Sequence, residues 1–396
     1  MREASSNLME RVERKIDSMS GRGCKLNQVS GRNLNLRQHY LQMLLLNLTF
    51  LFKMKNTCQT LLLIKTKIIK GDGTTLSDSN KVAPVNNFLH SMFSDCSVYL
   101  NQKLITAYVE TLFNYNEEPK KLYLQSQLWY KDDAGEMDSC NNDNTGWVER
   151  HDLAAKGRVV SMIGRLHADI LCQTKLSPNG IAMDIKLTPA KASFCLMSSE
   201  DNAEYKFSIL DATLFVRKCK NKPTGGNCAC NSSRKVPISR VEMKSVTIPS
   251  NVTSKEIPNH YIGQLPVRII AFLVNNSAAN GILAENPYNV EHFDLNYLSL
   301  HVDGQQIPST PLTPNYSSGD FIEAYYSTIL DTYLQFMDDG HTIETSDYND
   351  GYCFYCFALT ADQSASDLHW QLRKSGTIRH VNRLEIYSYE QFNIIT

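Results

Sequence analysis

The sequence of 396 residues lacks the short motifs that mark the common enzyme classes. It contains no Gly-x-x-x-x-Gly-Lys-Ser/Thr loop, no Gly-x-Ser-x-Gly elbow, no His-Glu-x-x-His pair and no Gly-x-Gly-x-x-Gly turn. These motifs bind phosphate, present a nucleophile, hold zinc or bind a dinucleotide, so the usual signatures of those enzymes are missing. None of the ten histidines is paired at metal-ligand spacing. We therefore expect no catalytic, cofactor-binding or metal-binding residues.

The chain also lacks a strong net charge and a long apolar run. Forty Lys and Arg residues stand against 41 Asp and Glu residues, which gives the whole molecule no electrostatic footprint for nucleic acid. The longest apolar stretch, residues 40–52, includes polar residues and is shorter than the ~20 residues that a membrane-spanning helix requires. The first 25 residues contain no apolar signal-peptide core. We expect a protein that is not secreted and has no transmembrane segment.

Eleven cysteines, an odd number, leave at least one thiol without an intramolecular partner. Most lie in apolar, strand-like runs, so we expect them to be reduced. Cys353 and Cys356 have the spacing of half a zinc site, but positions three apart in a strand face opposite sides of a sheet, which favours structural cysteines. Cys219, Cys228 and Cys230 have no nearby histidine to complete a tetrahedral site, and a labile metal site there stays an open alternative.

Acidic pairs occur at Asp132-Asp133 and at Asp338-Asp339, both in polar, turn-like surroundings. Paired carboxylates are the machinery of glycosidases, but solvated loop carboxylates are far commoner, and we interpret both pairs as solvated. The first 70 residues hold 13 Lys and Arg against 4 Asp and Glu, without interleaved aromatic residues. Because single-stranded nucleic acids stack on such aromatics, we expect no specific nucleic-acid partner.

From residue 58 onward, short stretches of apolar-polar alternation separated by turn residues dominate the sequence. One such stretch ends at the hairpin signal Gly71-Asp72-Gly73. Residues 166–176 and 181–187 are predicted to form a hairpin across Pro178-Asn179-Gly180. About sixteen short strands with long, variable connections predict antiparallel sandwiches and not a parallel α/β sheet.

A faint internal repeat is the most informative pattern. Residues 97–105 align with 299–307 at an offset of 202, and residues 107–112 align with 324–329 at an offset of 217. The repeat predicts two β domains of similar topology, although strand-turn-helix pieces can also recur by chance. The expected organisation is an atypical, disordered or non-native segment at residues 1–57, a first domain at 58–218, a linker at 219–236 and a second domain at 237–396.

The string APVNNFLHSMFS at residues 83–94, followed by SVYLN at 97–101, resembles the major capsid proteins of Polinton (Maverick) elements and adintoviruses. Residues 1–57 do not resemble the N-terminal region of that family, which normally supplies the first strand. The chain therefore resembles an endogenous genomic copy with a degraded N-terminus. Further strings in the same order extend the resemblance over about residues 58–396, at 128–132, 163–169, 193–197, 209–218, 263–266, 286–289, 295–298, 302–308 and 347–352.

The resemblance implies an all-β double jelly roll, in which two antiparallel eight-stranded β-sandwiches lie side by side with short helices in the loops. The first jelly roll is expected to lack a strand. The implied function is structural and not enzymatic, with no cofactor: a major capsid protein that forms trimeric pseudo-hexameric capsomers of an icosahedral shell. The implied partners are further copies of the chain and a penton or minor capsid protein.

The implied location is the virion, after an intracellular stage in the host cytoplasm or nucleus. A subunit of an obligate oligomer buries apolar surface against its neighbours. We therefore expect an exposed aromatic patch around Phe321, Tyr325 and Tyr326.

Two other functions stay open. A carbohydrate-active or amidase-type hydrolase can also be built from two jelly rolls, and it predicts a cleft with two carboxylates about 5 to 9.5 Å apart. A host-domesticated binding module would keep the fold without assembling.

Overall fold

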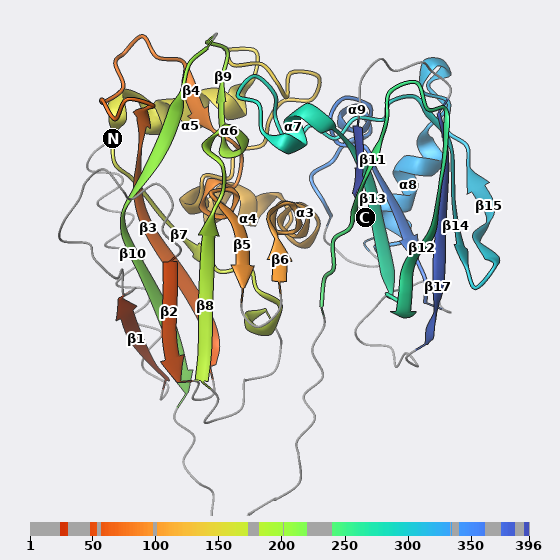
Figure 1. Cartoon of the computed structure of the whole chain (residues 1–396), viewed down its shortest axis with the longest axis horizontal. Helices are drawn as coiled ribbons and strands as arrows, with labels where there is room; N and C mark the ends of the chain where they lie inside the picture. The colour runs from red at the N-terminus through yellow and green to blue at the C-terminus, as the bar shows by residue number, and fades with distance from the viewer. Residues whose placement is uncertain are drawn as a thin grey trace, which may run out of the picture.

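The computed structural model describes residues 24–30, 48–53, 57–97, 101–172, 182–200, 202–219, 240–332, 334, 340–360, 374–384 and 392–395. Strands form two side-by-side sandwiches, and short helices lie at one end and between them (Figure 1).

The first sandwich consists of two four-stranded antiparallel sheets, with the strand orders β1-β10-β3-β7 and β2-β8-β5-β6. Leu62, Ile64 and Ile68 of β3 are buried, because successive side chains of a strand point to opposite faces. A ribbon of β4 and β9 adds to this half. The strands are β1 (Cys24–Ser30), β2 (Leu48–Lys53), β3 (Thr57–Lys70), β4 (Val82–Pro84), β5 (Phe93–Ser97), β6 (Asn101–Lys103), β7 (Val160–Arg165), β8 (Ala182–Pro189), β9 (Leu196–Ser198) and β10 (Tyr205–Cys219).

The second sandwich repeats this plan with the strand orders β11-β18-β13-β16 and β12-β17-β14-β15. Phe354 and Cys356 of β16 and Leu298 and Leu300 of β14 are buried in its core. The strands are β11 (Ser245–Ile248), β12 (Ser254–Gln264), β13 (Arg268–Asn275), β14 (Leu295–Val302), β15 (Gln305–Leu312), β16 (Phe354–Ala358), β17 (Ser375–Leu384) and β18 (Phe392–Ile395).

The helices fill the connections. Those of the first half lie mainly between β6 and β7, and those of the second half between β13 and β14 or between β15 and β16. They are α2 (Phe88–Ser91), α3 (Leu104–Asn114), α4 (Glu117–Leu122), η3 (Leu124–Gln127), α5 (Thr145–Ala154), η4 (Ala155–Gly157), η5 (Asp169–Leu171), α6 (Ala192–Cys195), α7 (Asn276–Asn280), η6 (Tyr316–Ser318), α8 (Ile322–Leu330) and α9 (Thr345–Asn349).

The two halves have the similar topology that the internal repeat predicted. Strand β5 is third in its sheet and β14 is third in the corresponding sheet, while β6 and β15 are fourth in theirs. Each fourth strand leads into a helix, α3 in the first half and α8 in the second. In the second half η6 lies between the strand and the helix, where the sequence alignment requires extra residues.

The expectation that residues 1–57 supply no strand is wrong at β1 and β2. Strand β1 pairs along its whole length with β10, from Cys24 opposite Cys219 to Ser30 opposite Thr213, and β2 pairs with β8. Local alternation did not reveal these strands, because pairing with distant partners determines them. Both sheets of the first sandwich therefore have four strands, and the expected loss of a strand is not seen.

The predicted hairpin of residues 166–176 with 181–187 is also wrong. Residues 166–172 form a buried loop and η5, and the strand before them, β7, pairs with β3. Strand β8 instead pairs with β2 and β5 in the opposite sheet. Strands β7 and β8 thus belong to two different sheets, and period-two alternation cannot distinguish this case from a hairpin. The predicted linker 219–236 lies almost wholly outside the described residues.

Candidate functional site: the seam between the two jelly rolls

The boundary along which the two jelly rolls meet is called the seam below. An ion pair with no exposed side-chain surface lies in this seam. Arg150 of α5 donates from Nη2 to Asp132 Oδ1 at 2.5 Å, and both side chains are 0% exposed. The same guanidinium donates from Nε to the Pro84 carbonyl at 2.8 Å and from Nη1 to the Tyr130 carbonyl at 2.6 Å. Asn144 fixes the start of α5 by accepting from the Trp147 amide. All these groups belong to the first half.

The second half binds the same carboxylate. Asn286 donates from Nδ2 to Asp132 Oδ2 at 3.2 Å and to the Met137 carbonyl at 3.0 Å. Tyr352 donates from its hydroxyl to the Asp132 carbonyl at 2.7 Å. A buried charge is tolerated only when it is paired and hydrogen-bonded, so these bonds fix the position of one half against the other.

This arrangement corrects the interpretation of Asp132 as a solvated carboxylate. Its neighbour Asp133 is half-buried and accepts a hydrogen bond from the Thr145 amide with Oδ2. The second acidic pair, Asp338-Asp339, lies outside the described residues.

Aromatic stacking continues the seam. Tyr108 of α3 lies between Trp129, at a ring-centroid distance of 5.3 Å, and Tyr288 of the second half, at 4.0 Å. Phe113, also of α3, contacts Phe354 edge to face at 5.3 Å. Burial raises the pKa of both Tyr108 and Tyr288 above the usual value of tyrosine. Helix α3 is therefore one of the elements of the first half that pack against the second.

Two lysines also cross the seam. Lys120 of α4 is buried and donates from Nζ to the Leu112 carbonyl at 2.8 Å and to Thr342 Oγ1 at 2.9 Å. Burial, with a smaller contribution from Lys131, lowers the pKa of Lys120 to about 7. Lys131 donates to the Thr342 carbonyl at 2.8 Å and pairs with Asp347.

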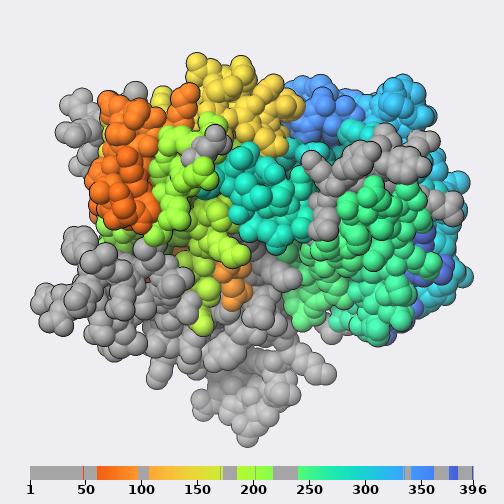
Figure 2. Space-filling model, turned by 45° about the horizontal axis from the view of Figure 1, so that its top comes forward, coloured from red at the N-terminus to blue at the C-terminus, as the bar shows by residue number. Residues whose placement is uncertain are grey.

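The two halves also contact each other near the molecular surface. Figure 2 shows the segment around α5 in contact with the segment around α9, and the Gly135 amide donates to the Asp350 carbonyl at 2.7 Å there. The Ser198 amide donates to the Leu283 carbonyl at 2.7 Å in the neighbouring contact. Backbone hydrogen bonds therefore join the two halves outside the buried ion pair.

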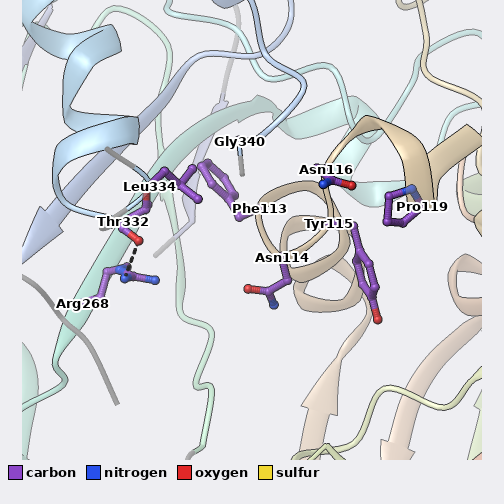
Figure 3. Close-up of a pocket in the computed structure, with 9 residues that line it drawn as sticks. All are labelled: Phe113, Asn114, Tyr115, Asn116, Pro119, Arg268, Thr332, Leu334 and Gly340. Carbon is purple, nitrogen blue, oxygen red and sulfur yellow. Dashed lines mark hydrogen bonds between the residues drawn. The ribbon is translucent and has the colours of Figure 1, made fainter. Parts of the chain in front are cut away.

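A hollow of about 290 Å³ opens beside α3 and α4 where they face the second half (Figure 3). Arg268 donates across its wall to the Thr332 carbonyl at 3.1 Å. None of the described residues that line this hollow is acidic, and the acidic pair Asp338-Asp339 between Leu334 and Gly340 lies outside the described residues. The lining residues are Phe113, Asn114, Tyr115, Asn116, Pro119, Arg268, Thr332, Leu334 and Gly340.

Cys353 and Cys356 are both buried. The Cys353 sulfur lies 3.2 Å from the Tyr316 hydroxyl and 3.3 Å from the Tyr355 hydroxyl, and burial raises its pKa to about 11. By strand alternation Cys356 faces the other side of β16. The structure brings no three His, Cys, Asp or Glu residues together around a shared metal position in the part of the chain that it describes. That neither cysteine binds zinc stays a prediction.

Cys219 is the last residue of β10, and Cys228 and Cys230 lie outside the described residues. No helix within the described ranges is both long and apolar enough to cross a membrane.

The expected exposed aromatic patch is reduced to one residue. Phe321 stacks on Tyr316 at 5.7 Å, and Tyr325 donates from its hydroxyl to the Ile343 carbonyl at 3.3 Å. Only Tyr326 is exposed, at 47%. The helical repeat explains the difference, because residues 321 and 325 lie on the face of α8 that packs inward.

No sequence pattern predicted the roles of Arg150 and Lys120, which lie in polar helices without a periodic pattern. Tyr108 lay inside the internal repeat, and Asn286 and Tyr288 lay inside a string that carried the family resemblance. For Asn286 and Tyr288 that resemblance was the one available signal, and for Tyr108 it was the repeat.

Comparison with known proteins supports the fold. No known family profile matches the sequence. The structure is similar to that of the Sputnik virophage, with a TM-score of 0.60 and 9% identity over 95% of this chain and 85% of that chain. It is also similar to the Faustovirus major capsid protein, with a TM-score of 0.54 and 6% identity over 94% of this chain and 88% of that chain. The mavirus major capsid protein gives a TM-score of 0.51 and 10% identity over 93% of this chain and 86% of that chain.

One sequence relative, an uncharacterized protein of Caenorhabditis elegans, is 21% identical over 276 residues. The match covers 63% of this chain and 61% of that protein, so the chain spans less than two thirds of its relative's length. At these identities the solved structures establish the architecture alone. The all-β double jelly-roll fold predicted from the sequence is confirmed.

Proposed function

We propose that this chain is a major capsid protein whose trimers form pseudo-hexameric capsomers of an icosahedral shell. The observation that carries the proposal is the seam: two jelly rolls of identical strand order are held side by side by a buried ion pair that both halves contact. The likeness to viral major capsid proteins over nearly the whole chain supports it.

Rigid pairing of two similar sandwiches is what such a capsomer requires. Three copies can close a ring in which six sandwiches alternate, because head-to-tail contacts form a ring when the rotation closes. If the two halves could move freely, the edges of the subunit would not stay equivalent. The buried hydrogen bonds of the seam provide this rigidity.

The rest of the proposal follows from a structural role. The chain acts without a catalytic centre or cofactor, and its partners are further copies of itself, neighbouring capsomers and a penton or minor capsid protein. It resides in the virion after an intracellular stage. The strings shared with Polinton and adintovirus capsid proteins support an origin as an endogenous copy of such an element.

The mass of the purified full-length chain in solution tests the proposal. Light scattering coupled to size exclusion is expected to give three times the chain mass of 44.9 kDa. A particle of 44.9 kDa at every concentration would contradict the capsid function and favour the non-assembling binding module.

A further inference from the structure

A short strip of the second half, residues 341–343, contacts the first half beside helix α4. Lys120 donates from Nζ to Thr342 Oγ1 at 2.9 Å, and Lys131 donates from Nζ to the Thr342 carbonyl at 2.8 Å. Ile343, the last residue of this strip, is buried. The contacts of the 341–343 strip therefore hold the two halves together at the α4 end of the seam.

His341 fixes this strip through hydrogen bonds that require a neutral imidazole. Its Nδ1 accepts from the Ile343 amide at 3.3 Å, so the ring proton lies on Nε2. Nε2 lies 2.9 Å from Thr328 Oγ1, which donates to the Tyr325 carbonyl at 2.7 Å and therefore accepts from the ring. A second proton would make Nδ1 a donor that points at the donor of the Ile343 amide, and this bond would be lost.

The charged groups that act on His341 from the first half are cations. Burial lowers the pKa of His341 to about 4, with smaller contributions from Lys120 and Lys131. Phe113 of α3 contacts the ring edge to face at a centroid distance of 5.5 Å and carries no charge. Asp347 of α9 is paired with Lys131. A protonated His341 would therefore face two lysines across the seam, and none of its hydrogen bonds within the described part of the chain goes to a carboxylate.

The other zone of the seam is built differently. Arg150 and Asp132 form a pair with no exposed surface, and Asn286 and Tyr352 of the second half bond the same aspartate. An arginine stays charged at every pH at which proteins are folded, and the described bonds of this network include no histidine. One zone of the seam thus depends on a neutral histidine, and the other depends on a permanent cation.

We propose that the 341–343 strip is a pH switch in the seam. A proton that binds His341 Nδ1 breaks the bond to the Ile343 amide and places a cation opposite the two lysines, and the strip then separates from the first half. The ion pair of Arg150 with Asp132 stays intact and keeps the two halves connected. At neutral pH the subunit is rigid, and acid converts it into a looser form without unfolding it. The switch is a property of the single chain, so it does not depend on assembly.

The direction of the pH effect follows from the protonation of the two forms. In the open form His341 is in solvent and titrates near pH 6.5, whereas in the closed form its pKa is about 4. Above pH 6.5 neither form binds the proton, and the closed form is fully stable. Between these values only the open form binds it, so the ratio of open to closed form rises about tenfold per pH unit as the pH falls, or about 300-fold in total.

Hydrogen–deuterium exchange of the full-length chain, measured by mass spectrometry from pH 7 to pH 4, tests the switch. After correction for intrinsic exchange rates, peptides covering residues 107–122 and 340–349 should lose protection, while residues 144–154 of α5 should keep it. His341→Gln retains a side-chain donor for Thr328 but cannot be protonated, so it should abolish this loss. His151→Gln is the matched control, because His151 is a half-buried histidine of α5, and it should behave like the unmodified chain.

Lys120→Met decides the matter if His341→Gln disturbs folding. It removes a cation that disfavours a charged His341, so the rise in exchange between pH 6.5 and 4 should shrink by about threefold or more. Lys121→Met, at an exposed position of the same helix, should leave the rise unchanged. The proposal is wrong if both zones of the seam lose protection equally at every pH. It is also wrong if His341→Gln and Lys120→Met both keep the full pH dependence.

Discussion

The two jelly rolls have the same strand order, but they differ in how far the helix after the fourth strand is buried. The seam side of the first jelly roll is closed by a buried ion pair, stacked tyrosines and a buried lysine. On helix α8 of the second, Ile322 and Tyr326 are exposed beside the exposed acidic residues Asp320 and Glu323. Helix α3 of the first half therefore carries buried aromatic contacts to the second half, whereas α8 of the second half keeps two exposed apolar side chains.

The difference shows how a chain can divide its contacts between folding and assembly. A contact within the chain forms once, as the protein folds, and can include a charge that must never be left unpaired. A contact between copies has to tolerate water before assembly, so its residues carry no buried charge. Substitutions in the seam should therefore cost much more stability than matched substitutions at the surface.

The largest effect is expected at the ion pair. Asp132→Ala leaves Arg150 charged and buried without a partner, which should lower the free energy of unfolding by about 3–5 kcal/mol in urea titration. Asp78→Ala is the matched control, because its partner Lys156 is exposed and such pairs contribute about 0–1 kcal/mol. Equal losses from the two substitutions would show that the seam is no more important than a surface pair.

Removing the amide that reaches across the seam should have a smaller effect. Asn286→Ala deprives Asp132 Oδ2 and the Met137 carbonyl of a donor, at a cost of about 1–3 kcal/mol. The control is Asn280→Ala, which removes an exposed amide at the end of α7 and should change stability by less than about 0.5 kcal/mol. If Asn286→Ala also changes stability by less than this, the bonds across the seam do not hold the halves together.

Acid should lower the stability of both sandwiches through their buried histidines, of which His90 in the first and His380 in the second have the most strongly lowered pKa values. Burial, with a smaller contribution from His260, lowers the pKa of His380 to about 3, and burial, with a smaller contribution from His167, lowers that of His90 to about 3. In the unfolded chain each titrates near pH 6.5, so the unfolded state binds more protons between these values. Stability is complete above pH 6.5 and falls with decreasing pH by about 1.4 kcal/mol per unit for each histidine.

Single substitutions separate the contributions of His90 and His380 to this pH dependence. His90 bonds Asn87 and the Arg165 carbonyl, whereas the His380 nitrogens have no hydrogen-bond partner among the described residues. His380→Leu should therefore flatten the loss of stability between pH 6.5 and 4 without lowering it at pH 8. His90→Leu should flatten it as well, but it should lower stability at pH 8. Unchanged pH profiles would contradict the assignment of neutral, buried imidazoles.

The smallest effect is expected in metal content. Purified protein should contain no stoichiometric zinc, because strand alternation from Cys353, just before β16, to Cys356 within it turns the two sulfurs to opposite faces. Cys353→Ser should leave the metal content unchanged in elemental analysis. Stoichiometric zinc that this substitution removes would overturn the prediction.

Much of the fold could be predicted, because both strand alternation and the internal repeat are visible in the sequence itself. Alternation in β3 and β14 and the faint repeat at an offset of 202 were enough for two β domains of similar topology. Strand β1 could not be predicted, because its pairing with β10 joins residues almost 200 positions apart. The predicted hairpin that includes β8 was wrong, because apolar-polar alternation does not show which strand a segment pairs with, and β8 pairs with β2 and β5.

The seam was harder to predict than the strands. Asp132 lies in a polar sequence that reads as a solvated turn, and only the approach of α5 and of Asn286 makes it a buried, paired carboxylate. Polar residues in loops have no periodicity, so the sequence pattern does not distinguish a buried hydrogen-bond network from polar side chains that are exposed to solvent. Helix periodicity, if applied to residues 321–326, would have separated Tyr326 from Phe321 and Tyr325.

Electron microscopy of the purified full-length protein tests the central claim most directly. We expect particles with six lobes around a threefold axis, in which the two lobes of each chain alternate. Particles that show only two lobes, at concentrations where the protein stays soluble and folded, would contradict it.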